Sequence, residues 1–159
     1  MSTKKKIPIS CDWKRTVPQV HKGKKTYTKH KSKLYKHKGN FKWQGIKIEK
    51  YKSGGRNWSN ILRQTLIGNK KETAKFHVRY FEIEPGGYSS FEMHKHEHVV
   101  ICVRGKGNAL VGEKTYDMNF MDTLYVASHM AHQLRNPFDT PFGFLCIVNA
   151  KRDRPKILK

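Results

Sequence analysis

The chain has 159 residues and carries 33 Lys and Arg residues against 12 Asp and Glu residues, which gives a formal net charge of +21. This length suits one domain with its own hydrophobic core. No apolar run approaches the roughly 18 residues that a membrane helix needs, and no apolar segment typical of a secretion signal follows the first lysines. We therefore expect a cytoplasmic protein with no membrane partner.

The positive charge is concentrated near the N-terminus. Residues 1–52 hold 17 basic and two acidic residues, a net charge of +15, whereas the rest of the chain carries only +6. Residues 1–40 are rich in Lys, Thr, His and Gly and can bury little apolar surface, which predicts an extended or mobile basic arm. We predict a folded domain over residues 41–150 and a charged C-terminal tail over residues 151–159.

The three cysteines are an odd set, and Cys102 and Cys146 lie within apolar runs. Such cysteines are typical of small buried side chains in a reducing compartment. We therefore expect no disulfide framework.

Short strands are predicted along most of the domain. Residues 45–52 alternate apolar and basic side chains, which is typical of an edge strand, whereas residues 58–68 fit a strand or a short helix, of which we favour the strand. Residues 75–84 predict a strand with a bulge near Tyr80, where the phase of the apolar residues changes. Further strands are predicted at residues 99–103, 108–112, 114–118, 123–127, 130–135 and 142–149, with a hairpin turn at residues 112–113.

The spacing of these strands predicts the fold class. They recur at intervals of about 8 to 12 residues, and no helical pattern appears after Lys75. We predict an all-β fold, either a closed β-barrel or a double-sheet jelly roll.

The residues from Glu92 to His98 carry the strongest chemical signal. Glu92, His94, His96 and His98 occupy alternate positions, and alternate side chains of a strand share one face. One carboxylate with several imidazoles suits a divalent transition metal such as Mn, Fe, Co, Ni or Zn. The alternative is a solvated strand face. We favour a metal site, because the segment leads directly into an apolar strand and buried imidazoles without partners are costly.

Two blocks of the chain resemble the motifs of the cupin superfamily. Gly86, Glu92, His94, His98 and Gly105 have the spacing of the first motif, G-x5-H-x-H-x3-E-x6-G. Residues 121–136 have the register of the second motif, G-x5-P-x-G-x2-H-x3-N, and place His132 and Asn136 on its His and Asn. The resemblance extends over residues 75–149.

The chain departs from the family pattern in two ways. Glu92 stands where the family usually has its first His, and His98 stands where it usually has Glu, so the two residue types are exchanged. Met121, Ala127 and His129 replace the Gly, Pro and Gly of the second motif, which are turn positions rather than ligands.

The resemblance implies a single jelly-roll barrel with a metal inside, bound by Glu92, His94, His98 and His132. His96 then serves as a supporting residue or as an alternative ligand. The further candidates for the barrel interior, for which core or surface packing is the alternative, are Tyr80, Tyr116, Tyr125 and Gln133.

The resemblance implies a metal-dependent enzyme of the isomerase, lyase or dioxygenase type that acts on a small oxygen-rich metabolite. Cupins commonly form dimers, so a homodimer is expected. The alternative is a non-catalytic binding or sensing module whose basic arm contacts nucleic acid or an acidic partner.

Overall fold

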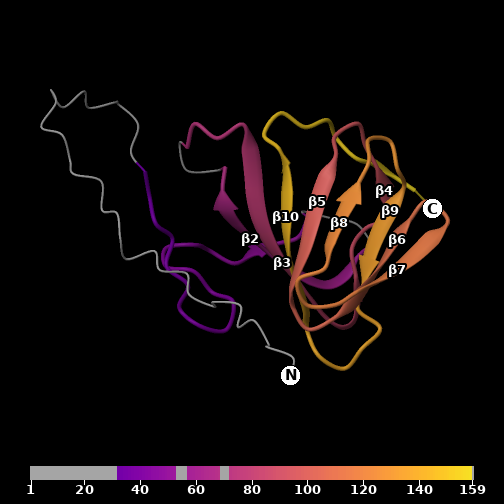
Figure 1. Ribbon diagram of the computed structural model, residues 1–159, viewed down its shortest axis with the longest axis horizontal. Helices are drawn as coiled ribbons and strands as arrows, with labels where there is room; N and C mark the ends of the chain where they lie inside the picture. Colours follow the sequence, from indigo (N-terminus) through magenta and orange to yellow (C-terminus); the bar gives the residue numbers. More distant parts are fainter. Residues whose placement is uncertain (1–31, 53–56, 69–71, 159) are drawn as a thin grey trace, which may run out of the picture. The chain divides into compact units, whose positions relative to one another are not determined.

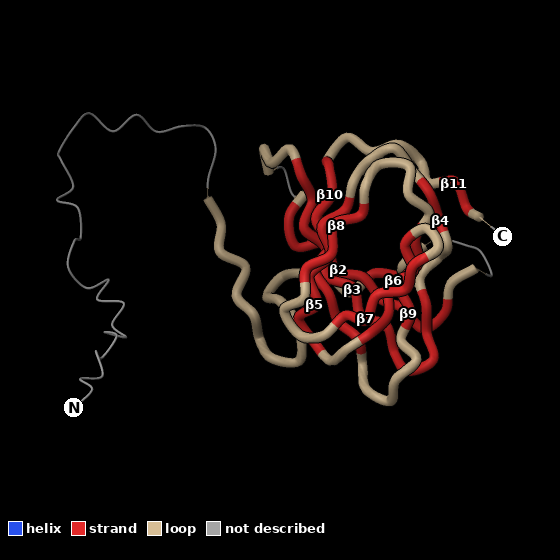
Figure 2. Tube along the Cα trace, turned by 45° about the vertical axis from the view of Figure 1, so that its right-hand side comes forward, coloured by secondary structure: helices blue, strands red, loops and turns tan. Residues whose placement is uncertain are grey.

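The computed structural model describes residues 32–52, 57–68 and 72–158. In this part of the chain every regular element is a β-strand (Figures 1 and 2). None of the described residues forms a helix long and apolar enough to cross a membrane. The strands are β1 (Glu49–Lys50), β2 (Ser59–Ile67), β3 (Phe76–Tyr88), β4 (Glu92–Met93), β5 (His98–Arg104), β6 (Gly107–Val111), β7 (Lys114–Met118), β8 (Thr123–Val126), β9 (His132–Arg135), β10 (Phe142–Asn149) and β11 (Lys156–Ile157).

The strands form one antiparallel sheet that curves into a nearly closed barrel. Its main path runs β11-β4-β9-β3-β10-β5-β8, with β2 paired to β3 and β6 paired to both β7 and β9. Figure 1 shows β2, β3, β10, β5 and β8 on one side of the barrel and β4, β9, β6 and β7 on the other. The all-β barrel predicted from the strand spacing is confirmed.

Alternation of buried and more exposed side chains explains why these residues form strands. In β5, His98, Val100 and Cys102 are buried, whereas the intervening Val99 and Ile101 are only partly buried. Strand pairing continues this inner face onto β10, where Cys146 lies opposite Val100. The inward-facing side chains of β5 and β10 therefore line the same barrel interior.

The interior is packed with aromatic and branched apolar side chains. Phe81 and Phe144 stack with ring centroids 5.4 Å apart, and Phe142 lies beside Phe144 at 5.1 Å. Cys102 and Cys146 are buried free thiols, as their apolar neighbourhoods predicted. The other buried members of the core include Ile61, Ile83, Val100, Ala109, Met118, Leu134 and Val148.

The predicted bulge near Tyr80 is wrong. Strand β3 pairs with β10 without a register shift, so that Tyr80 lies opposite Leu145. Its pairing with β2 does shift beside Tyr80, between Thr65 and Ile67, but the extra residue there belongs to β2 and not to β3. Tyr80 and Phe81 are both buried because both faces of β3 are covered. The change in apolar phase therefore reflects burial on two faces and not an extra residue in the strand.

The segment before β1 covers the outer face of β3. Phe41 stacks on Tyr80 with ring centroids 5.4 Å apart and nearly parallel planes, and Trp43 packs against the same ring at 5.2 Å. Beneath these rings, Glu82 accepts hydrogen bonds from Tyr80 and from Arg104, the latter at 2.6 Å. We call Phe41, Tyr80, Glu82 and Arg104 the outer cluster. Residues 1–31 of the predicted basic arm lie outside the described residues.

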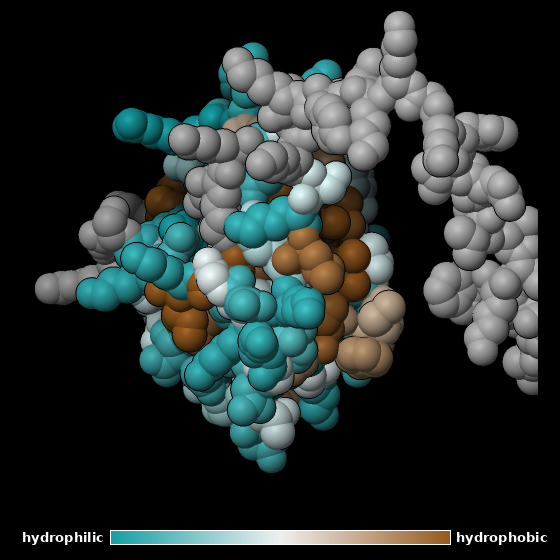
Figure 3. Space-filling model, turned by 90° about the vertical axis from the view of Figure 1, so that its left-hand side faces the viewer, coloured by the Kyte–Doolittle hydropathy of each residue, from teal (hydrophilic) through white to brown (hydrophobic). Residues whose placement is uncertain are grey.

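Figure 3 views the molecule from the side of β2, where hydrophilic residues cover most of the surface and apolar residues form smaller groups between them. The predicted edge strand over residues 45–52 is reduced to β1, which pairs with β2 through Glu49 and Arg63. The predicted tail contains β11, which pairs with β4. The tail thus joins the sheet beside the histidine segment.

The hairpin predicted at residues 112–113 is confirmed, since Val111 and Lys114 are paired on either side of it. Two of the turns that use a non-glycine residue in a left-handed conformation fall within the second motif. Met121 has a φ of 71° and His129 has a φ of 62°, and both stand where the family motif has glycine. The turn geometry is therefore retained although the residue best suited to it is absent.

Candidate metal centre

Three imidazoles converge inside the barrel. One ring nitrogen from each of His94, His98 and His132 lies within 4.8 Å of the others, and all three residues are buried. His94 comes from the loop between β4 and β5, His98 begins β5, and His132 begins β9. We call these residues the histidine triad.

Backbone carbonyls orient two of the rings. The Nδ1 of His94 lies 2.8 Å from the carbonyl oxygen of His96, and the Nδ1 of His132 lies 2.9 Å from that of Met130. A carbonyl can only accept, so each Nδ1 carries the proton and each Nε2 keeps its lone pair. The Nε2 atoms of His94 and His98 face each other at 2.9 Å. Backbone contacts therefore present free lone pairs toward one point.

Burial keeps these rings neutral. Burial, together with the neighbouring imidazoles of His96 and His132, lowers the pKa of the His94 imidazole to about 4. Burial also lowers the pKa of His98 and of His132 below the ordinary value. Neutral imidazole is the form that binds a metal ion, so near pH 7 the triad is in its ligand form.

Glu92 lies beside the triad but is not one of the three converging groups. It is buried on β4 and paired with His132 of β9. Its carboxylate accepts hydrogen bonds from Ser90 Oγ at 2.7 Å and from the Lys52 ammonium. The structure therefore brings three of the four predicted ligands together and places the fourth next to them, with Lys52 and Ser90 as its partners.

His96 lies against the triad. Its ring stacks on that of His94 with centroids 3.7 Å apart, and its Nδ1 lies 2.8 Å from Oδ1 of Asp153. The same carboxylate accepts a hydrogen bond from the backbone N–H of Lys95. The hydrogen bond from His96 holds the pKa of Asp153 below its usual range. Asp153 therefore orients the ring that supports His94.

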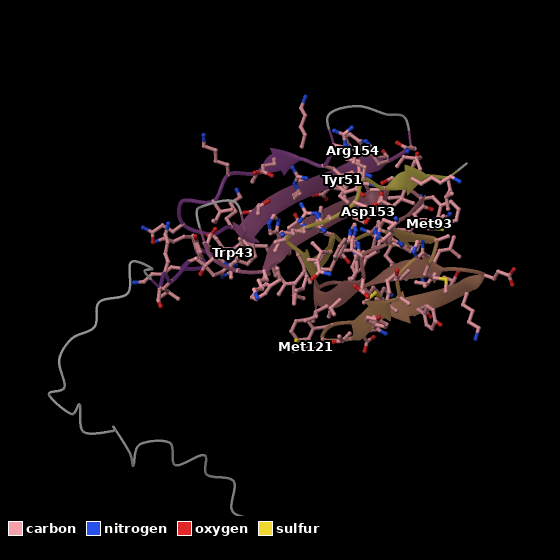
Figure 4. The ribbon with its side chains drawn as sticks, turned by 90° about the horizontal axis from the view of Figure 1, so that it is seen from above. Trp43, Tyr51, Met93, Met121, Asp153 and Arg154 are labelled. Carbon is pink, nitrogen blue, oxygen red and sulfur yellow. The ribbon has the colours of Figure 1, made fainter. Side chains whose placement is uncertain are left out.

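Sequence reasoning missed Asp153, because it lies 57 residues from His96 and in the tail. Figure 4, which views the barrel from above, shows Asp153 between Tyr51 and Met93, with Arg154 farther out. The pairing of β11 with β4 brings Asp153 to this position. No local motif marks it.

Cys146 lies on the far side of His98 from the triad. Its sulfur is 3.3 Å from His98 Nδ1, and Arg79 Nη2 donates to the same sulfur at 3.3 Å. Burial raises the pKa of the thiol. Cys146 thus contacts the nitrogen of His98 that faces away from His94. The spacing of the motifs did not indicate that Cys146 lies beside the site.

A cavity of about 180 Å³ is lined by two of the triad histidines, His98 and His132, and by His96. Its walls include the apolar side chains of Phe81, Val100 and Phe144 and four cationic side chains, which are Lys52, Arg63, Arg79 and Arg152. None of the tyrosines proposed for the interior lines it: Tyr80 faces the outer cluster, whereas Tyr116 and Tyr125 are 44% and 62% exposed. Gln133 is buried but bonds to the Ser89 carbonyl.

The residues present fit a divalent metal ion. Three neutral imidazoles direct ring nitrogens at one point, and a carboxylate lies at the edge of the same site. Such a donor set suits borderline transition metals. The buried histidine triad is therefore compatible with a bound metal.

Comparison with known proteins identifies the class. Residues 79–148 match the family model described as the cupin domain. Over 118 residues, which are 74% of this chain and 74% of the relative, the chain is 36% identical to 1-methylthio-D-xylulose 5-phosphate methylsulfurylase of Rhodospirillum rubrum. The chain belongs to the cupin superfamily, as its two motif blocks predicted.

Solved structures agree with this assignment. A cupin 2 conserved barrel domain protein from Rhodopseudomonas palustris is 34% identical, with a TM-score of 0.73 over 80% of this chain and 87% of that one. A cupin-2 domain protein from Rhodospirillum rubrum is 32% identical, with a TM-score of 0.70 over 79% and 84% of the two chains. The jelly-roll barrel is thus the fold shared with these relatives.

Proposed function

We propose that this cupin is a metal-dependent enzyme acting on a small, oxygen-rich, anionic metabolite. The observation that carries the proposal is a neutral, buried histidine triad, two of whose members line a small cavity with cationic walls. The relative from Rhodospirillum rubrum is named for action on 1-methylthio-D-xylulose 5-phosphate, which is small, oxygen-rich and anionic. This compound is therefore the first substrate to test.

The Nε2 atoms of His94, His98 and His132 would hold the metal, which we expect to be Mn, Fe, Co, Ni or Zn. A bound ion of this kind supplies Lewis acidity that polarises a carbonyl or hydroxyl oxygen of the substrate. Glu92 is the residue best placed to add a carboxylate ligand, because it pairs with His132 across the β4–β9 ladder.

The chain's own residues prepare the site in three ways. Backbone carbonyls fix the protons of His94 and His132 on Nδ1. Lys52 and Ser90 hold the Glu92 carboxylate and balance its charge. The apolar side chains of Phe81 and Phe144 in the cavity wall exclude water beside them and so strengthen the polar interactions nearby.

The test begins with protein purified without a nickel column. Metal content is measured on the wild type and on Glu92→Ala and His132→Ala, and consumption of 1-methylthio-D-xylulose 5-phosphate is followed by mass spectrometry. The assay is run with and without a low-molecular-weight thiol, because transfer of the methylthio group to a thiol would form a mixed disulfide, with the thiol proton going to the carbon that loses sulfur. We expect metal at about one ion per chain and turnover only in metal-loaded protein. Wild-type protein without stoichiometric metal would contradict the proposal.

A second candidate is a non-catalytic module that binds nucleic acid or an acidic partner. It is favoured by the net charge of +15 on residues 1–52. Binding of this kind weakens steeply with salt. Deletion of residues 1–40 should abolish it, and absence of binding to DNA or RNA at low salt would remove this candidate.

A further inference from the structure

The four cationic side chains of the cavity differ in what they contact. Lys52 pairs with Glu92, and Arg63 pairs with Glu49 at 2.9 Å. Arg79 and Arg152 have no ion pair within the described part of the chain. Arg79 donates to the Cys146 sulfur, and Arg152 contacts His77 Nδ1 at 2.8 Å and the Asn149 carbonyl at 3.2 Å. Two guanidinium groups of the cavity wall therefore lack an anion.

Arg79 also has an unpaired hydrogen-bond donor. Its Nε is buried and has no hydrogen-bond partner in residues 32–52, 57–68 and 72–158. Its guanidinium lies over the Phe81 ring at 5.2 Å, which is also part of the cavity wall. A partly buried cation with an unpaired donor is costly unless a ligand or an anion completes it.

The arginines are close enough to repel one another. Burial lowers the pKa of Arg152 below its usual range, and the positive charges of Arg79 and Arg63 lower it further. A fold that holds three guanidinium groups around one cavity gains stability when a dianion enters it.

The arginines also lie next to the triad. Arg79 of β3, Cys146 of β10 and His98 of β5 follow one another across the barrel wall, each joined to the next by a 3.3 Å contact. A single sulfur atom thus separates Arg79 from a triad histidine. Cys146 contacts the nitrogen of His98 that faces away from the other two rings, so the cavity provides the route to the metal position. Arg79 and Arg152 line this cavity together with His98 and His132, and one small molecule in it can therefore contact both the arginines and the metal position.

We propose that Arg79 and Arg152, with Arg63 beside them, form a subsite for the phosphate group of the substrate, while the substrate's remaining oxygens reach the triad. This inference rests on the proposed function and names its substrate class as a phosphomonoester of a small sugar or polyol. Guanidinium groups suit this role because their planar pairs of donors match phosphate oxygens. Phosphate then supplies the negative charge that Arg79 and Arg152 lack.

The experiment measures binding to the full-length protein by isothermal titration calorimetry. The probes are inorganic phosphate, xylulose 5-phosphate and unphosphorylated xylulose. The variant is Arg152→Gln, an exposed position where loss of folding is not expected, and the matched control is Arg154→Gln, which removes the same charge two residues away and does not line the cavity. Arg79→Gln is added with circular dichroism to confirm its fold.

We expect xylulose 5-phosphate to bind at least tenfold more tightly than xylulose. Arg152→Gln should weaken that binding by tenfold or more, Arg79→Gln by at least as much, and Arg154→Gln by less than twofold. Equal losses in Arg152→Gln and Arg154→Gln would show attraction by general surface charge and overturn the proposal. The proposal would also be overturned if the arginines were needed for binding inorganic phosphate but xylulose 5-phosphate did not bind, since the site would then serve the free ion.

Metal content of the same samples separates this inference from the proposed function. Protein that holds metal and turns over substrate, but binds the phosphate ester equally well without Arg152, contradicts the subsite alone. Protein that binds the ester through Arg152 but holds no metal contradicts the proposed function alone.

Discussion

The outer cluster and the inner site are two sets of buried polar residues on opposite faces of the same strands. Their hydrogen-bonding groups are paired to different extents. In the outer cluster, the Glu82 carboxylate is matched by Arg104 and Tyr80, and aromatic rings cover them. In the inner site, histidine nitrogens face one another, and the Nε of Arg79 has no hydrogen-bond partner among the described residues. A buried group that is fully paired stabilises a fold, whereas a buried group left without a partner is available to a ligand.

The largest expected effect comes from the triad. His132→Ala removes one of three converging nitrogens, so bound metal should fall below about a tenth of an ion per chain and turnover should fall by more than about 100-fold. Metal analysis and kinetics measure this, and His129→Ala is the control because His129 is exposed and lies in a neighbouring turn. Retained metal in His132→Ala would remove His132 from the ligand set.

The outer cluster should respond in stability and not in metal binding. Glu82→Gln leaves Arg104 facing a neutral amide, and we expect a loss of about 2 kcal/mol in the free energy of unfolding. The loss is below that of a fully buried pair because the Arg104 side chain is 31% exposed. Urea denaturation measures it, with exposed Glu84→Gln as the control. A change in metal content would show that the two clusters are coupled.

The tail should affect the triad through His96. Asp153→Asn weakens the contact that orients this ring, so we expect metal affinity to fall about tenfold, as for other residues that position a ligand. Competition with a chelator measures the affinity, and exposed Asp139→Asn is the control. Equal affinities for the wild type and Asp153→Asn would mean that the stacked rings need no anchor.

The neutral triad makes the stability of the metal-free protein depend on pH. The folded pKa of His94 is about 4 and its ordinary value is 6.5, so the unfolded chain takes up a proton that the folded barrel resists. The free energy of unfolding should therefore fall as pH is lowered from 6.5 toward 4. Denaturant titrations of chelator-treated protein test this, and His94→Gln should flatten the slope. If His94→Gln left the pH dependence of the free energy of unfolding unchanged, the lowered pKa of His94 would not be its cause.

The smallest expected effect lies outside both clusters. Met121 adopts a left-handed conformation with its side chain 62% exposed. Met121→Gly relieves the steric cost and loses little packing, so we expect a gain of about 0.5 to 1 kcal/mol after the greater chain entropy of glycine is deducted. Thermal denaturation measures it, and a loss of stability would mean that the methionine packs in solution.

Much of the fold was predictable because local patterns determine strands. The apolar run at residues 99–103 predicted a strand and residues 112–113 predicted a hairpin, and both are present in the structure. The triad was predictable in part, because His94 and His98 are close in sequence and His132 follows a family motif. Local pattern failed at Tyr80, where a segment distant in sequence covers the second face of the strand.

The rest of the site depends on contacts between distant strands. Asp153 reaches His96 through the pairing of β11 with β4, and Cys146 reaches His98 through the pairing of β10 with β5. Nothing in the residues around either position indicates its partner. Such contacts follow from the register between strands, which the sequence of a single strand does not specify.

The end of the family match and the end of the site lie at different residues of the chain. The match to the cupin family ends at residue 148, yet Arg152 and Asp153 lie beyond it and line the cavity, as do Lys52 and Arg63 before its start. A chain shortened to the matched residues would keep all three triad histidines but lose three of the four cations and the anchor of His96. The smallest recognisable domain is therefore smaller than the smallest complete site.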